Sequence, residues 1–484
     1  MSRILTAADV QKHKTAESCW MALHGKVYDI TAFLATHPGG KAVLLKNAGK
    51  DATDAFDSFH PVEIIDEYLQ LDQVVGVFEA GAAEETTTPP PRPSSKALDV
   101  TVPDVVQKGA DDPIPPVSQI LSIAEMEHHA MKKLSPKAIS YYASGTDDEI
   151  TKSGNGTIFR SVLLRPRVFV DCTRCSLSTT ILGLPLAMPI YVSPAAMAKL
   201  AHPVGEAGIA AACSRFNALQ IISKNASISP SAIVAAGPDA VFAWQLYVLK
   251  DIAATERTLA QIRAIPQIKF IVLTLDAPFP GKREADERFK MAEVAGGAPP
   301  KAWGTESALT WRKTLSWLTK HTSLPIVLKG IQTHEDAYAA TLFPSVKGII
   351  ISNHGGRALD TTMTPLQVLL EIRRFCPEVL SKVDVLIDGG INRGTDVVKA
   401  LALGAKGVGI GRAALYSLAV GGQAGVERAL QILADETVTA MRLLGVDSVD
   451  QLGPRHVNTD GLTSRLYSGP SGLEEIDREL RSKL

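Results

Sequence analysis

Short apolar runs alternate with amphipathic segments through most of this chain. Each run is followed by polar or glycine residues and then by a helical pattern such as residues 394–403. Eight strand–helix repeats in one unit predict a closed (β/α)8 TIM barrel rather than an open sheet. The eight runs are residues 188–193, 219–223, 241–246, 269–275, 325–329, 346–351, 383–388 and 406–410.

A chain of 484 residues is too long for one ordinary domain. Residues 80–116 contain TTTPPPRPSS and DDPIPP, and such Pro/Ser/Thr-rich sequence stays extended and builds no core. This linker separates a small unit (residues 2–79) from the barrel unit (residues 117–478), and a short tail (residues 479–484) follows. Within the barrel, residues 280–308 are rich in Gly, Ala, Pro and Lys, which predicts a mobile lid.

The composition and charge of the chain argue against several classes of protein. The net charge is −1, and no basic patch indicates nucleic acid. No run of 18 apolar residues could span a membrane, and the first twenty residues do not form a signal peptide. Five cysteines suit a reducing compartment, and the single C-x-x-C at 172–175 is not expected to hold a metal or act in redox chemistry. The final Ser-Lys-Leu (482–484) predicts a peroxisomal location, with the cytoplasm as the alternative.

The clearest group of candidate catalytic residues follows the sixth apolar run, at Ser-Asn-His-Gly-Gly-Arg (352–357). His354 is positioned to accept a proton and Arg357 to hold a carboxylate, while the two glycines between them would let a flat cofactor approach the backbone. The carboxyl ends of barrel strands are where catalytic residues gather. The other strand ends carry a complementary set: Pro194, Ala195, Ala196, Ser223, Gln245, Tyr247, Thr274, Asp276, Arg283, Lys329, Ser352, Asp388, Gly389, Gly390, Arg393, Gly411 and Arg412.

The small unit carries its own motif. His37-Pro-Gly-Gly40 follows a short strand and turn (residues 27–30), and His60 lies further along. Two imidazoles on opposite faces of a haem leave no open iron position, which favours electron transfer. No C-x-x-C-H is present, so we expect non-covalent protohaem IX (haem b) with His37 and His60 as its ligands.

These motifs carry two resemblances. Residues 4–79 resemble the cytochrome b5 family, an α+β fold. Residues 120–478 resemble the FMN-dependent α-hydroxy-acid oxidases and dehydrogenases through the segments YYASG (141–145), QLYV, SNHGGR, DGG, RGTDV and MRLLG. Together, the two units are similar to the flavocytochrome b2 family of cytochrome-linked L-lactate dehydrogenases.

The resemblance implies FMN and haem b as cofactors, a small 2-hydroxy acid as substrate, and a cytochrome c-like protein or oxygen as electron acceptor. It also implies a homotetramer. Arg357 and Arg283 would hold the substrate carboxylate, His354 would be the base, and Asp276 would orient it. Tyr141 and Tyr247 would hydrogen-bond the substrate, Lys329 would lie near N1 of the flavin, and Gln245 and Thr274 would reach the ring edge. The glycine turns with Arg393 and Arg412 would bind the phosphate.

Each residue also has a structural alternative. Asp276 and Lys329 could form a salt bridge inside the barrel, Tyr141 could be a packing residue, and Ser223 could cap a helix. Three departures from the family stand out. Asn392 replaces an arginine after DGG, Ala413 replaces a proline, and Lys224-Asn225 follows Ser223 where relatives place a leucine or tryptophan. Polar groups there argue against a simple fit to lactate.

Three functions therefore compete. The first is a flavocytochrome that oxidises an L-2-hydroxy acid and passes electrons from FMN to haem and then to an acceptor. The second is an oxidase that forms hydrogen peroxide. The third is a haem electron-transfer protein with an inactive barrel, against which the retained His354, Asp276, Arg283, Arg357 and Lys329 argue.

Overall fold

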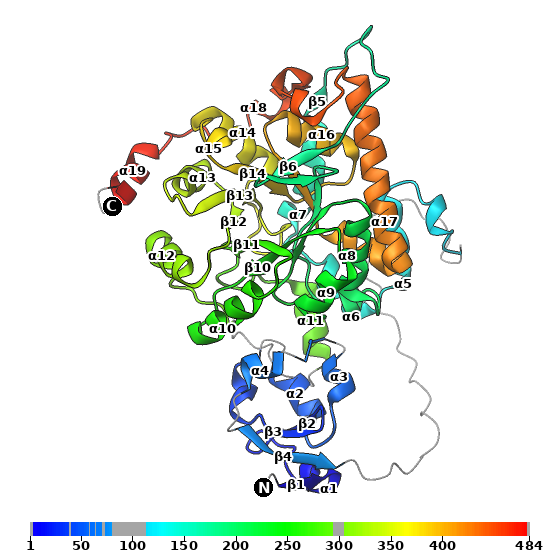
Figure 1. Cartoon of the computed structure of the whole chain (residues 1–484), viewed down its shortest axis with the longest axis vertical. Helices are drawn as coiled ribbons and strands as arrows, with labels where there is room; N and C mark the ends of the chain where they lie inside the picture. The colour runs from blue at the N-terminus through cyan, green and yellow to red at the C-terminus, as the bar shows by residue number, and fades with distance from the viewer. Residues whose placement is uncertain are drawn as a thin grey trace.

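The computed structural model describes residues 3–37, 40–57, 59–62, 64–69, 73–79, 113–293 and 304–481. It contains a small α+β unit and a large barrel unit (Figure 1). Most of the predicted linker (residues 80–112) lies outside the described residues.

The small unit is a four-stranded sheet, in the order β1-β4-β3-β2, with short helices beside it. β2 and β3 form an antiparallel hairpin, and β1 pairs in parallel with β4. Its elements are β1 (Ile4–Thr6), α1 (Ala7–Gln11), β2 (Trp20–Leu23), β3 (Lys26–Asp29), α2 (Lys41–Asn47), α3 (Thr53–Asp57), α4 (Ile64–Tyr68) and β4 (Val74–Glu79).

The large unit is the predicted closed barrel of eight parallel strands. All eight apolar runs became its strands, which confirms the fold prediction. In chain order these are β8 (Ile190–Val192), β9 (Leu219–Ile222), β10 (Val241–Leu246), β11 (Ile268–Thr274), β12 (Ile326–Ile331), β13 (Val346–Ile351), β14 (Asp384–Asp388) and β15 (Gly407–Ile410).

The strands are continuously apolar because both of their faces are buried. Ile221 belongs to the cluster inside the barrel, whereas its neighbour Ile222 packs in the layer between strands and helices. A hairpin of β6 (Thr179–Ile181) and β7 (Leu184–Leu186) adds Ile181 and Leu186 to the inner cluster.

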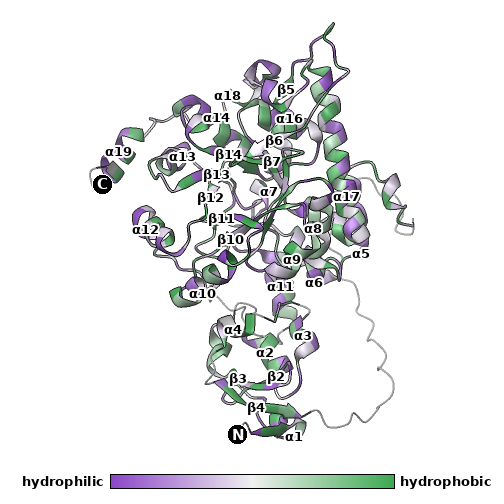
Figure 2. Ribbon diagram, viewed as in Figure 1, coloured by the Kyte–Doolittle hydropathy of each residue, from purple (hydrophilic) through white to green (hydrophobic). Residues whose placement is uncertain are grey.

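Helices surround the strands, and in Figure 2 several of them, such as α12 and α17, carry both purple and green segments. They are α8 (Gly205–Arg215), α9 (Pro230–Ala236), α10 (Ile252–Arg263), α12 (Trp311–His321), α13 (His334–Thr341), α14 (Pro365–Phe375), α15 (Val379–Lys382), α16 (Gly394–Ala402) and α17 (Arg412–Leu443). Before the barrel come α5 (Ile123–Lys133), α6 (Pro136–Ala143) and α7 (Ile150–Thr157), and after it α18 (Asp460–Thr463) and α19 (Leu473–Arg481). Among the described residues, no helix is long and apolar enough to cross a membrane.

Part of the segment predicted as a mobile lid is a helix, α11 (Glu284–Glu293), in which Asp286 pairs with Lys290 and with Arg283 just before the helix. Residues 294–303 of that segment lie outside the described residues. The last helix, α19, crosses the predicted boundary at residue 478 and ends at Arg481.

Barrel lysines contact the small unit. Lys199 Nζ donates to the Asp57 carbonyl oxygen at 2.8 Å. Lys137 lies 4.5 Å from the ring centre of Phe59, and Lys224 lies 5.8 Å from that of Tyr68. These contacts place the loop that contains His60 beside the mouth of the barrel.

Candidate active site and haem site

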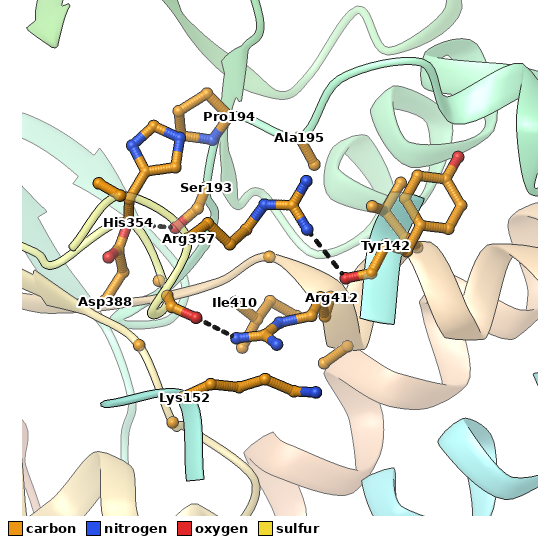
Figure 3. A pocket seen from close by; sticks show the side chains of 18 of the residues that line it. Tyr142, Lys152, Ser193, Pro194, Ala195, His354, Arg357, Asp388, Ile410 and Arg412 are labelled. Atoms are coloured by element: carbon orange, nitrogen blue, oxygen red, sulfur yellow. Dashed lines mark hydrogen bonds between the residues drawn. The ribbon is translucent and has the colours of Figure 1, made fainter. Parts of the chain in front are cut away.

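The carboxyl ends of the barrel strands surround a cavity of about 490 Å3. This size is within the range of small-molecule and cofactor sites. Figure 3 shows side chains from several strand ends converging there. The sequence-predicted residues that line it are Tyr141, Pro194, Ala195, Ala196, Ser223, Gln245, Tyr247, Arg283, Lys329, His354, Arg357, Asp388, Gly389, Gly390, Gly411 and Arg412.

His354 and Asp276 form the hydrogen-bonded pair at the centre of this site. His354 Nδ1 lies 2.9 Å from Asp276 Oδ1, and the Asp276 side chain is fully buried. Burial raises the pKa of Asp276, but the charges of His354 and Lys329 outweigh it, so the pKa lies below its usual value. An ionised carboxylate only accepts hydrogen bonds, so the imidazole proton sits on Nδ1 and Nε2 keeps its lone pair. His354 is therefore oriented to accept a proton at Nε2.

Local backbone geometry produces this pair. His354, Gly355 and Gly356 all have positive φ, of 58°, 67° and 74°, so the chain turns sharply after β13. Gly330 of β12 has no side chain, and Asp276 occupies the space that a side chain there would need. A Cβ atom at Gly330 would lie 2.6 Å from the Cβ atom of Asp276. Gly330 was not among the residues predicted from the sequence.

Arg357 and Arg283 both lie close to the ring of Tyr141. Their guanidinium carbons are 5.2 and 5.3 Å from the centre of the Tyr141 ring. Arg357 is fixed by its Nη1, which donates to the carbonyl oxygens of Tyr141, Tyr142 and Ser144. Burial, and then the charge of Arg283, lower the pKa of Arg357 to about 10, so it stays charged at neutral pH. Burial raises the pKa of Tyr247, which keeps that phenol protonated as a donor.

Lys329 is the buried cation beneath the cavity. Its Nζ donates to Ser352 Oγ at 2.7 Å and lies 3.4 Å from Asp388 Oδ2, which also accepts from Ser193 Oγ at 3.0 Å. Burial lowers the pKa of Lys329, but Asp388 and Asp276 outweigh it and raise the pKa. The structural alternative was a salt bridge between Lys329 and Asp276. It does not form, because Asp276 bonds to His354.

A second polar chain crosses the neighbouring strand ends. Ser223 Oγ donates to Gln245 Oε1 at 3.1 Å, and Gln245 Nε2 donates to Thr274 Oγ1 at 3.1 Å. Ser223 therefore orients Gln245. Thr274, Asp276 and Ser352 are buried directly behind residues that line the cavity.

The structure does not bring every predicted residue to the cavity. Arg393 Nη1 bonds to Glu436 Oε1 at 2.8 Å, so its guanidinium points away, and we correct its assignment. Lys224 faces Tyr68 of the small unit, whereas Asn225 does line the cavity. The glycine at 356 is required by protein packing, because a Cβ there would lie 2.5 Å from the Lys152 amide nitrogen.

Sequence reasoning missed several residues. Glu206 Oε1 accepts from the amides of Ala198 and Ser227, which ties the loop after β8 to the loop after β9. Lys152 and Asn155 of α7 were also missed, because α7 precedes the barrel and no strand-end pattern marks it.

In the small unit, His37 and His60 come together between aromatic side chains. Their ring centres are 6.2 Å apart, with Phe33 and Phe56 in contact with them. Burial lowers the pKa of both histidines, that of His60 to about 4, so both imidazoles are neutral. Metal–imidazole bonds are about 2 Å long, so two rings on opposite sides of one metal ion have centres roughly 6 Å apart. The pair fits a haem iron between them.

Two family profiles match this chain. The FMN-dependent dehydrogenase family matches residues 130–459, and the cytochrome b5-like haem/steroid-binding domain matches residues 6–79. The chain belongs to the FMN-dependent dehydrogenase family and carries a cytochrome b5-like domain in front of the barrel.

Individual relatives cover one or both units. The L-lactate dehydrogenase (cytochrome) of Saccharomyces cerevisiae is 36% identical over 493 residues, which cover 97% of this chain and 82% of that protein. The glycolate oxidase of Spinacia oleracea is 37% identical, covering 73% of this chain and 98% of that protein. A solved structure of a mutant flavocytochrome b2 with bound pyruvate matches with a TM-score of 0.68 and 38% identity, covering 74% of this chain and 91% of that one. The chain is thus similar to the L-lactate dehydrogenase (cytochrome) of Saccharomyces cerevisiae across nearly its whole length.

FMN fits the cavity. Lys329 gives a positive charge at the strand ends, where the isoalloxazine ring would lie beside Gln245 and Pro194. At the other end, Gly411 precedes the first turn of α17, and a Cβ there would meet nothing within 4 Å. A helix N-terminus with open space in front of it, and with Arg412 beside it, suits a phosphate.

Proposed function

We propose that this enzyme oxidises an L-2-hydroxy acid to the 2-oxo acid and passes the electrons to an external acceptor of the cytochrome c type. The observation that carries this proposal is the meeting of His354, held by Asp276, with Arg357 in one cavity. A 2-hydroxy acid carries a carboxylate next to a hydroxyl group. Its oxidation therefore needs a cation that binds the carboxylate and, next to that cation, a group that accepts the hydroxyl proton. The two cofactor sites in one chain supply the route for electrons.

The protein residues have separate tasks in this reaction. Arg357 and Arg283 bind the substrate carboxylate. Arg357 bonds to the protein through Nη1 and Arg283 pairs with Asp286 through Nη2, so the other N–H groups of each guanidinium are left for the carboxylate. His354 Nε2 takes the hydroxyl proton, and Asp276 stabilises the resulting imidazolium. Tyr247, kept protonated by burial, donates to the substrate.

When bound, FMN would accept the carbon-bound hydrogen of the substrate together with the two electrons, and haem b would relay the electrons to the acceptor. Lys329, Gln245 and Ser223 hold the ring end of the flavin site, and Gly411 with Arg412 holds the phosphate end. Lys329 stays charged beside Asp388, which favours negative charge on the ring edge nearest to it.

The proposal is tested by anaerobic spectroscopy. Addition of a 2-hydroxy acid should bleach the flavin absorbance and then reduce the haem. A barrel that is inactive would leave both spectra unchanged for every 2-hydroxy acid tried.

The relatives named glycolate oxidase favour a second candidate, a peroxide-forming oxidase. Steady-state rates with oxygen and with cytochrome c separate the two functions. The dehydrogenase requires a much higher rate with cytochrome c and little hydrogen peroxide, whereas the oxidase requires the reverse.

The substrate side chain is proposed to meet Asn225. This residue lines the cavity at the end of β9, after Ser223. The Asn225 side chain is exposed, so a substrate methyl group packed on it would take its amide out of water. An amide left without a partner in this way costs roughly 1–3 kcal/mol. A hydroxy acid with a polar or longer side chain avoids that cost, and we therefore propose L-lactate as a poor substrate.

Two further proposals concern assembly and location. We propose a homotetramer, to be tested by light scattering of the holoenzyme. We also propose peroxisomal import through Ser482-Lys483-Leu484, which lie outside the described residues. A fluorescent protein fused in front of the full chain should reach peroxisomes, and deletion of the three residues should abolish this.

A further inference from the structure

The phosphate end of the flavin cavity lacks one expected cation. Asn392 occupies the position after DGG where the family usually has arginine, and it lines the cavity. Its neighbour Arg393 does not replace that arginine, because its guanidinium pairs with Glu436 at 2.8 Å. A phosphate bound here would therefore lose one of its charge-assisted hydrogen bonds from this loop.

Helix α7 and the 3-10 turn that follows it (Ile158–Ser161) bring two other cations to the same end of the cavity. Asn392 Nδ2 lies 3.3 Å from the position of a Cβ at Gly156, so the short Asn392 side chain faces α7. Lys152 and Arg160 flank Gly156, each four residues away along the chain, and all three line the cavity. The positive charge missing from the loop is thus present on the adjacent segment.

The barrel fixes the position of α7. Asp360, after β13, accepts from the amides of Thr151 and Ile150 at 2.7 and 3.2 Å, which anchors the helix N-terminus. Asn155 and Asn353 donate to each other's side-chain oxygen at 2.8 Å. Lys152 therefore projects from a helix clamped against the cavity.

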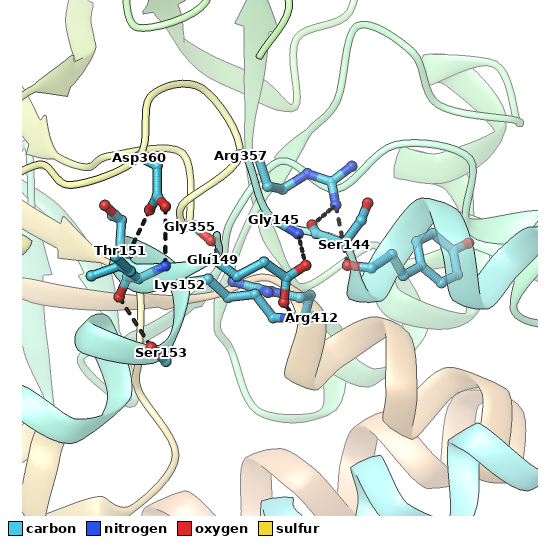
Figure 4. A network of polar contacts seen from close by, with 12 residues as sticks. Ser144, Gly145, Glu149, Thr151, Lys152, Ser153, Gly355, Arg357, Asp360 and Arg412 are labelled. Carbon is cyan, nitrogen blue, oxygen red and sulfur yellow. Dashed lines mark hydrogen bonds and ion pairs between the residues drawn. The ribbon is translucent and has the colours of Figure 1, made fainter. Parts of the chain in front are cut away.

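Lys152 lies alongside Arg412, as Figures 3 and 4 show. Its Nζ donates to Glu149 Oε2 at 2.6 Å, and Glu149 is itself held by the amide of Gly145. An ammonium group has three donors, so two remain for a ligand. Arg412 donates to the Gly355 carbonyl at 2.6 Å through one nitrogen and keeps its other donors.

We propose that Lys152, with Arg160 at the rim, binds the FMN phosphate in place of the arginine that Asn392 replaces. The phosphate charge is then met by Arg412 from the loop after β15 and by α7 from outside the barrel. This inference rests on the family's cofactor, and not on the identity of the substrate.

The test compares FMN with riboflavin, which lacks the phosphate. The full chain is stripped of flavin, and the dissociation constants of both flavins are measured by flavin fluorescence. Lys152→Met should weaken FMN binding roughly tenfold to hundredfold, as expected for a lost hydrogen bond to a charged group, and leave riboflavin unchanged. Arg160→Gln should have a smaller effect, because Arg160 is exposed.

Two variants make the test specific. Asn392→Arg in the Lys152→Met background should restore most of the FMN affinity, because the charge returns to the loop. Arg393→Gln is the matched control, and its FMN affinity should equal that of the wild type. An unchanged ratio of FMN to riboflavin affinity in Lys152→Met would overturn the proposal, as would equal weakening of both flavins. A chain that binds neither flavin would overturn the cofactor assignment as well.

Discussion

Replacing Asp276 with asparagine removes the charge that orients His354 and keeps the shape of the side chain. Asp276 Oδ1 accepts from His354 Nδ1 at 2.9 Å, and its side chain is fully buried. Hydrogen bonds to a charged group contribute about 1.5–3 kcal/mol, and each 1.4 kcal/mol is a factor of ten in rate. The bond strengthens when His354 takes the proton, so its loss acts on the transition state. We expect flavin reduction to slow by roughly tenfold to hundredfold.

Stopped-flow absorbance under anaerobic conditions measures this rate directly. Substrate affinity should change little, because Arg357 and Arg283 hold the carboxylate independently of Asp276. Asp384→Asn is the matched control, since Asp384 begins β14 at the opposite end of the barrel, where it accepts from the Leu182 amide at 2.6 Å. The control should reduce the flavin at no less than about half the wild-type rate. Flavin reduction in Asp276→Asn within twofold of the wild type would refute the proposed role of the pair.

Four further outcomes are expected. His354→Gln should lower flavin reduction by at least about 10²–10⁴-fold with little change in substrate binding, and near-normal reduction would remove His354 from the mechanism. His37→Ala should abolish the haem Soret band while substrate still reduces the flavin, because the barrel has its own core. Loss of both the Soret band and flavin reduction in a folded protein would contradict this expectation. Asn225→Leu should raise kcat/KM for L-lactate, and a wild type that prefers lactate to every polar 2-hydroxy acid would disprove the pocket argument. In haem-free protein, the free energy of unfolding of the small unit should fall as the pH drops from about 6.5 toward 4. The reason is that His60 takes up a proton at a higher pH in the unfolded chain than in the folded chain. A melting temperature that stays constant over this range would contradict a buried, neutral His60.

The sequence by itself determined the barrel and most of the residues that line its cavity. Short apolar runs that alternate with helical patterns are typical of strands buried on both faces, and the carboxyl ends of parallel barrel strands lie at the same end of the barrel. The residues that follow those ends, such as His354 after β13 and Lys329 on β12, therefore met as predicted. The histidine pair of the small unit was predictable for a similar reason, because HPGG and His60 belong to a recognisable fold pattern.

Only the tertiary structure decided where the loop side chains point. Arg393 and Arg412 both follow glycine turns, yet Arg393 turns to Glu436 on α17 and Arg412 to Gly355. Lys224 and Asn225 are adjacent, yet one faces the small unit and the other the cavity. Strand periodicity fixes a direction for every side chain in a sheet, but a loop side chain is directed by partners distant in the chain. The place of Lys152 beside Arg412 depends on such partners, Asp360 and Asn353, which clamp α7 to the barrel mouth.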